Sequence, residues 1–372
     1  MPESSAERPG PQRLVSLDLL RGLAVIGMII VNEMDGMERV GPVYPLLLHS
    51  NWNGLTIADV VFPAFLFMVG VSIPVSFNDR KNADLARIVR RTVRLLILGF
   101  ILSNLFWLQK FSSGSWRLFG VLQRIALVYC ACALMFLKLP SRTRMAVAAA
   151  ILILYWPLTL IPTVDGVPTD LWVRGHNFVG SVDRALFGQG NHIFVHGPEG
   201  YDPEGLLGTL PAISQGLIGV TVGEYLLKQP GRRTMRMLAV AGIMMLAVGI
   251  AWGFVFPVIK DIWSSSFVLV TTGISLLLLV ALASMFDGRE MKGARRLAEI
   301  IVLPFGANAI AAYTIHEVGW SFLGWDVFQL PYREMLPSTG PRLASFAPVL
   351  LLLAVVWLCM FYLWRRRWLI RI

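Results

Sequence analysis

Charge is scarce in this chain of 372 residues. Asp, Glu, Lys and Arg make up only 15% of it, whereas globular proteins carry about 25%. Hydrophobic residues amount to 56%, and the mean hydropathy is +0.64. This composition excludes an intrinsically disordered chain and argues against a protein folded around one soluble core. It indicates an integral membrane protein.

Cysteine is also rare. The three cysteines, Cys130, Cys132 and Cys359, all lie inside apolar stretches. They suggest neither a disulfide framework nor the spaced pairs of a zinc site, so we expect no metal centre.

Ten stretches are apolar enough to cross a bilayer, which takes about 20 residues. They are approximately 14–33, 55–77, 93–111, 119–137, 145–162, 206–227, 236–256, 264–286, 297–322 and 344–364. The pattern predicts an all-α integral membrane protein with a bundle of about ten transmembrane helices. Residues 14–364 then form one transmembrane domain between an N-terminal tail, 1–13, and a basic tail, 365–372.

Basic residues exceed acidic ones, 33 against 23, and the net charge is +10. In a soluble protein this excess would suggest nucleic acid, but most of these residues fall in alternate loops, beginning with the N-terminal tail. Because Lys and Arg accumulate on the cytoplasmic side, we predict two cytoplasmic termini and no nucleic-acid partner. The large external loops are then about 33–54 and 163–205, and loops of this length are usually functional or disordered.

The densest group of polar residues runs from His49 to Asp59, directly before the second predicted span. Asn53 or Thr56 can cap that helix, and Asp59 suits the positive end of its dipole. These roles leave His49 unexplained. Because histidine exchanges protons near neutral pH and can accept an acyl group, His49 is a candidate catalytic residue. A solvated loop residue is the alternative.

Polar residues also mark both ends of the first predicted span. Asn32 ends it externally, where its amide either donates to a carbonyl oxygen that gains negative charge or only terminates the helix. At the cytoplasmic mouth, Asp18 and Arg21 lie three residues apart on one helix face. They form either an ion pair that anchors the helix or a site for a phosphorylated substrate.

Ionisable groups at membrane depth are costly and therefore candidates for function. Arg124, which follows Gln123 early in the fourth predicted span, needs a partner such as Asp59, Glu224 or an anionic ligand.

The external loop 163–205 offers further polar side chains. His192 and His196 have the i, i+4 spacing of metal ligands on a helix, but the glycines around them argue against a helix there. We therefore expect this loop, with His192 and Glu204, to bind a polar substrate.

Taken together, these residues resemble the heparan-α-glucosaminide N-acetyltransferase family of membrane acyltransferases. The resemblance extends over about 14–364, and the block Trp52-Asn53-Gly54-Leu-Thr56 is its most specific part. The other matching motifs are Ser16-Leu-Asp18…Arg21-Gly22, His49, Ala58-Asp59-Val60…Phe62-Pro63, Gly120-Val-Leu-Gln123-Arg124, Asp202-Pro-Glu204-Gly205 and Asn308…Tyr313…His316-Glu317.

The resemblance implies transfer of the acetyl group of cytoplasmic acetyl-CoA to the amine of a glucosamine-type sugar on the external side. It implies that His49 matches the catalytic histidine and Asn32 an active-site asparagine. The chain lacks the extra N-terminal portion and leading span of the lysosomal enzyme, which favours a bacterial-type homologue of the cytoplasmic (inner) membrane.

On this basis the candidate residues divide into two sets. For the acceptor we expect Asp59, Asn53, His192, Glu204 and His316. For the CoA donor we expect Arg21, Asp18, Gln123, Arg124 and Arg94.

Several alternatives stay open at the level of sequence. His49 could take the acetyl group covalently or deprotonate the amine for direct attack. A membrane transporter of an amino sugar or a related solute is the alternative function, because buried charges and a long external loop suit a permeation path equally well. The expected partners are the lipid bilayer, the CoA donor and an amino-sugar or glycan acceptor, and a homodimer is one alternative for the assembly.

Overall fold

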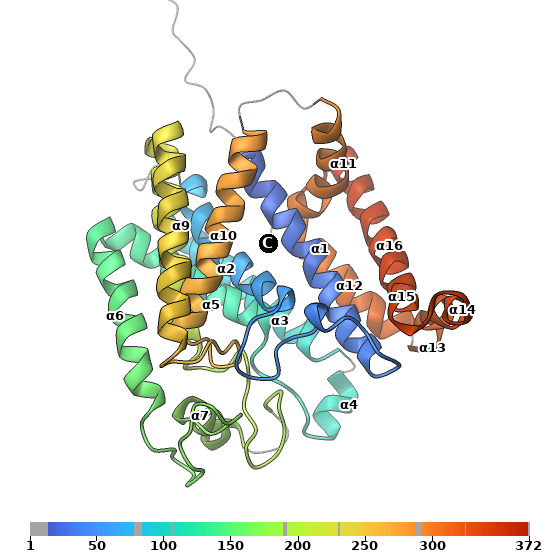
Figure 1. The fold of residues 1–372 in the computed structure, drawn as a ribbon, viewed down its shortest axis with the longest axis horizontal. Helices are drawn as coiled ribbons and strands as arrows, with labels where there is room; N and C mark the ends of the chain where they lie inside the picture. The colour runs from blue at the N-terminus through green and yellow to red at the C-terminus, as the bar shows by residue number, and fades with distance from the viewer. Residues whose placement is uncertain are drawn as a thin grey trace, which may run out of the picture.

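The computed structural model describes residues 14–77, 84–105, 107–188, 192–229, 231–287, 292–323 and 325–370. Within these ranges the chain forms a bundle of helices and no named strand, so the all-α prediction is confirmed (Figure 1). Its elements are α1 (Val15–Glu38), the 3₁₀ helix η1 (Pro45–Leu47), α2 (Ile57–Ser76), α3 (Leu85–Ser103), α4 (Trp107–Ser112), α5 (Val121–Lys138), α6 (Ser141–Thr159), α7 (Phe178–Phe187), α8 (Thr209–Lys228), α9 (Arg232–Gly253), α10 (Ser265–Phe286), α11 (Ala294–Ala307), α12 (Ala309–Leu323), α13 (Trp325–Phe328), α14 (Leu330–Thr339), α15 (Pro341–Ala344) and α16 (Phe346–Arg365).

Seven helical segments of the described chain are long and apolar enough to span a membrane. They are α1, α2, α5, α8, α9, α10 and the stretch Pro341–Arg365. An eighth span exists if α11 and α12 are one span bent by 77°. The chain is therefore a multi-pass membrane protein, while ten spans and cytoplasmic termini stay predictions.

Two of the ten predicted spans, 93–111 and 145–162, correspond to α3 and α6, which fall outside this set. Helix α3 begins well before residue 93, because the side chain of Asp84 accepts a hydrogen bond from the amide of Ala86 at 2.8 Å and caps the helix within a polar segment. The sequence pattern placed this helix too late because it followed hydropathy alone.

Helices α2 and α8 pack with their backbones in contact. A Cβ added to Gly70 would lie 2.0 Å from the carbonyl oxygen of Gly216, and one added to Gly219 would lie 2.3 Å from that of Phe67. Small residues allow such close approach between helices in a membrane. Their packing gives α2, whose first turn carries Asp59, a rigid support.

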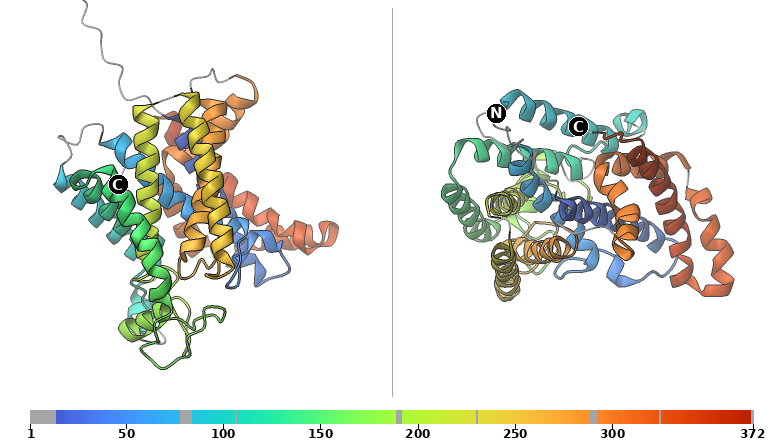
Figure 2. Two further views of the ribbon diagram at one scale, coloured as in Figure 1. Left: turned by 60° about the vertical axis from the view of Figure 1, so that its left-hand side comes forward. Right: turned by 90° about the horizontal axis from the view of Figure 1, so that it is seen from above.

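The long connections gather at one end of the bundle, drawn at the bottom of Figure 1 with α7. We call this the loop end. It contains 39–56, 160–188, 192–208 and 254–264, and the indole of Trp52 joins the first two by donating to the carbonyl oxygen of Leu171 at 2.8 Å. At the opposite end, the start of α1 lies beside the end of α10 (Figure 2). There the Ser16 hydroxyl donates to Asp287 at 2.6 Å.

Candidate functional site

His49 lies at the loop end, and its ring is held by Asp59. The Nδ1 atom of His49 is 2.9 Å from Oδ1 of Asp59. The carboxylate is fully buried, whereas the side chain of His49 keeps 33% of its surface exposed. A buried carboxylate on one ring nitrogen fixes the orientation of the ring and leaves Nε2 for another partner.

The local sequence explains why Asp59 is in place to hold His49. Thr56 is the N-cap residue of α2, and Asp59 in the first turn accepts from the Thr56 amide at 3.0 Å, as in a capping box. The amide of Ser50 donates to the same oxygen, Oδ2, at 3.2 Å. Asp59 therefore caps the helix with one oxygen and holds His49 with the other.

A second segment, 256–264, packs against the loop of His49. Asn53 forms an isolated antiparallel bridge with Ile259, and the amide of Gly54 donates to the carbonyl oxygen of Val258 at 2.9 Å. Gly54 has φ +134°, which favours glycine at this position. This pairing brings Lys260 close to the histidine, with Nζ 3.9 Å from Asp59 Oδ1.

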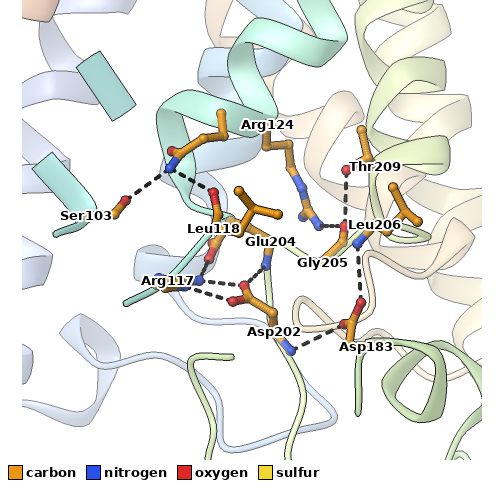
Figure 3. A network of polar contacts seen from close by, with 11 residues as sticks. Ser103, Arg117, Leu118, Arg124, Asp183, Asp202, Glu204, Gly205, Leu206 and Thr209 are labelled. Carbon is orange, nitrogen blue, oxygen red and sulfur yellow. Dashed lines mark hydrogen bonds and ion pairs between the residues drawn. The ribbon is translucent and has the colours of Figure 1, made fainter. Parts of the chain in front are cut away.

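A network of charged residues at the same end joins the start of α5 to the segment before α8 (Figure 3). The guanidinium of Arg117 donates to Asp202, with Nε 2.8 Å from Oδ2 and Nη2 2.5 Å from Oδ1, and it also donates to Glu204. Burial works against the charge of Arg117, but Glu204 and Asp202 outweigh it and hold the pKa of Arg117 above its usual range.

Glu204 is the carboxylate on which several cations act. Burial would raise the pKa of Glu204, but Arg117, Arg124 and Lys260 outweigh this effect and lower it. Lys260 therefore lies between two carboxylates, Asp59 of the His49 loop and Glu204 of the network, and connects the two parts of the site electrostatically.

Arg124 is 1% exposed and lies against the ring of Trp263, 4.9 Å from its centroid. Its Nη2 donates to the carbonyl oxygen of Gly205 at 3.1 Å, while Nε and Nη1 have no hydrogen-bond partner among the described residues. The two protein partners predicted for it are bound elsewhere, because Asp59 holds His49 and Glu224 accepts from Arg144 at 2.5 Å. A backbone carbonyl oxygen and an indole ring contact Arg124, Glu204 acts on it electrostatically, and the anionic ligand stays a prediction.

Asp183 of α7 supports the network from below in Figure 3. It accepts from the backbone amides of Asp202 and Leu206, each at 3.3 Å. Burial and the charge of Asp202 raise the pKa of Asp183 to about 7. The loop 163–205 contains α7, whose start is capped by the Asn177 side chain.

Another pair of a histidine and a carboxylate lies inside the bundle. Nε2 of His316 in α12 is 2.8 Å from Oε1 of Glu33 in α1, and both residues are at most 1% exposed. Asn32, the neighbour of Glu33, is half-buried. No hydrogen bond between the side chains of Asn32 and His49 is present in the described part of the chain.

The remaining candidates for the acceptor lie at the loop end but make different contacts. Nδ1 of His192 is 2.7 Å from the carbonyl oxygen of Trp116, and the two rings stack with centroids 4.2 Å apart. Asn53 is exposed and is held through its backbone. The geometry therefore brings together His49, Asp59 and Asn53, links Glu204 to them through Lys260, and places His192 beside the network.

The candidates for the donor do not form one cluster. Asp18 and Arg21 form an ion pair of 3.1 Å at the opposite end, with Arg21 also donating to Ser72 at 2.8 Å. Arg94 is exposed on α3. Arg124 lies at the loop end (Figure 3), and so does Gln123, which donates to the carbonyl oxygen of Leu118.

Sequence reasoning did not select Lys260, Arg117 or Asp183 as site residues. All three lie in connections or short helices, where their partners are far away along the chain. The only signal in the sequence was position, because each lies on the predicted external side. No group of three or more metal-ligating side chains occurs within the described ranges.

Comparisons with known proteins identify the family of the chain. A family model described as "Heparan-alpha-glucosaminide N-acetyltransferase, catalytic" matches residues 13–253, more than half of the chain. The human protein named heparan-alpha-glucosaminide N-acetyltransferase is 30% identical over 368 residues, which cover 83% of this chain and 53% of the human one. The mouse protein of that name is 29% identical over 376 residues, or 85% and 55% of the two chains. The chain spans about half the length of these relatives, and it belongs to the heparan-α-glucosaminide N-acetyltransferase family of transmembrane N-acetyltransferases.

Proposed function

We propose that this protein transfers the acetyl group of cytoplasmic acetyl-CoA across the membrane to the amine of a glucosamine-type sugar at the loop end. The observation that carries the proposal is the His49–Asp59 pair. Asp59 holds Nδ1 of His49 at 2.9 Å while a third of the side chain stays exposed, so Nε2 remains for the substrate. The loop end is then external, in a bacterial cytoplasmic membrane.

Two routes use Nε2 of His49. In direct transfer the amine nitrogen attacks the thioester carbon, the N–C bond forms as the C–S bond breaks, and Nε2 takes the amine proton and returns it to the sulfur. In the covalent route Nε2 attacks the thioester carbon, the C–S bond breaks and the thiolate leaves. The amine nitrogen then attacks the acetyl carbon, the bond to Nε2 breaks, and the proton that the amine loses balances the thiolate. In both routes the amide of Asn32 donates to the carbonyl oxygen as charge develops on it.

The acceptor and the donor enter from different ends. Around the sugar we assign Asp59, Asn53, Glu204 and His192. The phosphates of the donor fit the opposite end, where Arg21 is partly exposed and is oriented by Asp18 and Ser72. Arg124, at the loop end, is better placed for the acyl group or the acceptor than for the nucleotide.

Proteoliposomes loaded with labelled acetyl-CoA test this function. Glucosamine, or an oligosaccharide with a terminal glucosamine, is supplied outside, and the acetylated product is measured outside. We expect external N-acetylated sugar from the native chain and a loss in His49→Ala. Accumulation of unmodified sugar inside the vesicles would support the transporter instead, and no acetylation of either acceptor would refute the proposal.

The two routes are separated by trapping. Labelled acetyl-CoA without acceptor gives an acetylated protein in the covalent route, and this label is lost in His49→Ala. Asn32→Ala is expected to reduce turnover by up to roughly 10²–10³. Unchanged turnover in Asn32→Ala would remove Asn32 from the site.

A further inference from the structure

Lys260 lies on a tight turn between α9 and α10. The amide of Trp263 donates to the carbonyl oxygen of Lys260 at 2.9 Å, and that of Ser264 donates to the carbonyl oxygen of Ile259 at 3.0 Å. Trp263 has φ 55°, a left-handed conformation that is rare for a bulky residue. Burial of its side chain against Phe62 and Phe267 offsets the cost of this conformation. The turn is therefore a constrained support for Lys260.

The same turn is attached to the loop of His49. The bridge between Asn53 and Ile259 and the hydrogen bond from Gly54 to Val258 fix the two segments against each other immediately before Lys260. The side chain of Lys260 is only 13% exposed. Its place beside Asp59 thus follows from backbone pairing and does not depend on a mobile surface side chain.

Lys260 acts on the oxygen of Asp59 that also receives His49. Its Nζ is 3.9 Å from Oδ1, whereas the capping contacts of Thr56 and Ser50 use Oδ2. The cation therefore faces the half of the carboxylate that orients the histidine.

Two more carboxylates lie around Lys260. Asp261 follows it in the chain and accepts a hydrogen bond from the hydroxyl of Tyr201 at 2.5 Å, and Glu204 is paired with Arg117. Both interact electrostatically with Lys260. The charged groups that surround His49 are thus Asp59 in direct contact, then Lys260, and beyond it Glu204 and Asp261.

We propose that Lys260 is a positioning residue for His49: its ammonium group keeps Asp59 ionised as the acceptor for Nδ1, and it offsets the attraction of that carboxylate for a protonated ring. The Nε2 lone pair is then directed to the substrate. The consequence of this role for catalysis rests on the proposed acetyl transfer. The effect of Lys260 on the titration of His49 can be measured without any substrate.

The test compares Lys260→Met, which removes the charge and keeps the length, with Lys260→Arg, which keeps the charge. Lys228→Met, an exposed lysine at the end of α8, is the matched control. The full-length protein in detergent, labelled with ¹⁵N-histidine, is titrated by NMR, and the His49 signal is identified by its loss in His49→Ala. In parallel, kcat/KM for acetyl transfer is measured against pH.

Removal of a cation at this distance should move the titration midpoint of His49 upward by about 0.5–1 pH unit. We expect this shift in Lys260→Met, with the acid limb of kcat/KM moving in the same direction, and a midpoint near the native one in Lys260→Arg and Lys228→Met. An unchanged midpoint in folded Lys260→Met would overturn the proposal. If the protein transfers no acetyl group, the NMR titration still decides the role of Lys260, so the two failures are distinguishable.

Discussion

Two of the histidine–carboxylate pairs in the described part of the chain have almost equal lengths but different surroundings. His49 is 2.9 Å from Asp59, and His316 is 2.8 Å from Glu33. The His49 side chain is 33% exposed at the loop end, whereas that of His316 is 2% exposed between α1 and α12. Contact geometry alone therefore does not identify a catalytic histidine. Access to substrate separates the two.

The sharpest test of this difference is His49→Ala. If His49 accepts the proton or the acetyl group, its loss should reduce turnover by a few hundredfold or more, with little effect on stability because the side chain is partly exposed. Turnover per folded molecule is the measurement, with His196→Ala, an exposed histidine of the same end, as the control. Near-native turnover in His49→Ala would show that His49 is not the catalytic histidine, so that exposure does not distinguish a catalytic pair from a structural one.

Asp59→Asn tests the orientation of the ring. An amide at this position no longer favours a single ring orientation or a protonated intermediate, so we expect turnover to fall by about 10²-fold. The capping contact to Thr56 at 3.0 Å can persist with the amide oxygen. A fall in thermal stability without a fall in turnover per folded molecule would show that Asp59 serves the helix cap only.

His316→Leu should have the opposite pattern from His49→Ala. It leaves the buried carboxyl of Glu33 without its histidine, and loss of one partner of a buried polar pair costs about 1–3 kcal/mol, or more for a charged group. We expect a lower unfolding temperature in detergent and turnover per folded molecule within a few-fold of native. The reverse result, a stable but inactive protein, would make the second pair part of the chemistry and support the predicted acceptor role of His316.

The contacts of these pairs also show which features of the fold and the site could be predicted from the sequence. Hydropathy located a helix in each of the ten predicted stretches, and the polar run from His49 to Asp59 pointed to the loop end, because both signals are local along the chain. The contacts of Lys260 and Glu33 join residues from distant segments. No local pattern encodes them, so the sequence could not predict them without the fold.

The start of α3 and the surroundings of Arg124 were not predicted for two different reasons. The Asp84 cap places the start of α3 in a polar segment, and it is a local signal that hydropathy does not include. The carbonyl oxygen, the indole ring and the charge of Glu204 near Arg124 come from segments distant in the chain, which no local pattern reveals. The assignment of the donor residues Asp18, Arg21 and Arg94 stays a prediction.

Asp183 offers the smallest test, because it is a buried carboxylate that holds backbone amides and has no histidine partner in the described contacts. Its pKa is raised to about 7 by burial and by Asp202. Between about pH 4 and 7 the folded state then binds a proton that the unfolded state has released, so the contribution of this group to stability is present at low pH and is lost as the pH rises through 7. The native chain should therefore lose stability relative to Asp183→Asn over this window, which thermal unfolding at pH 5, 6 and 7 would measure. Parallel pH curves for the two proteins would show that Asp183 is ionised throughout and that burial without a histidine does not suffice to keep this carboxyl protonated.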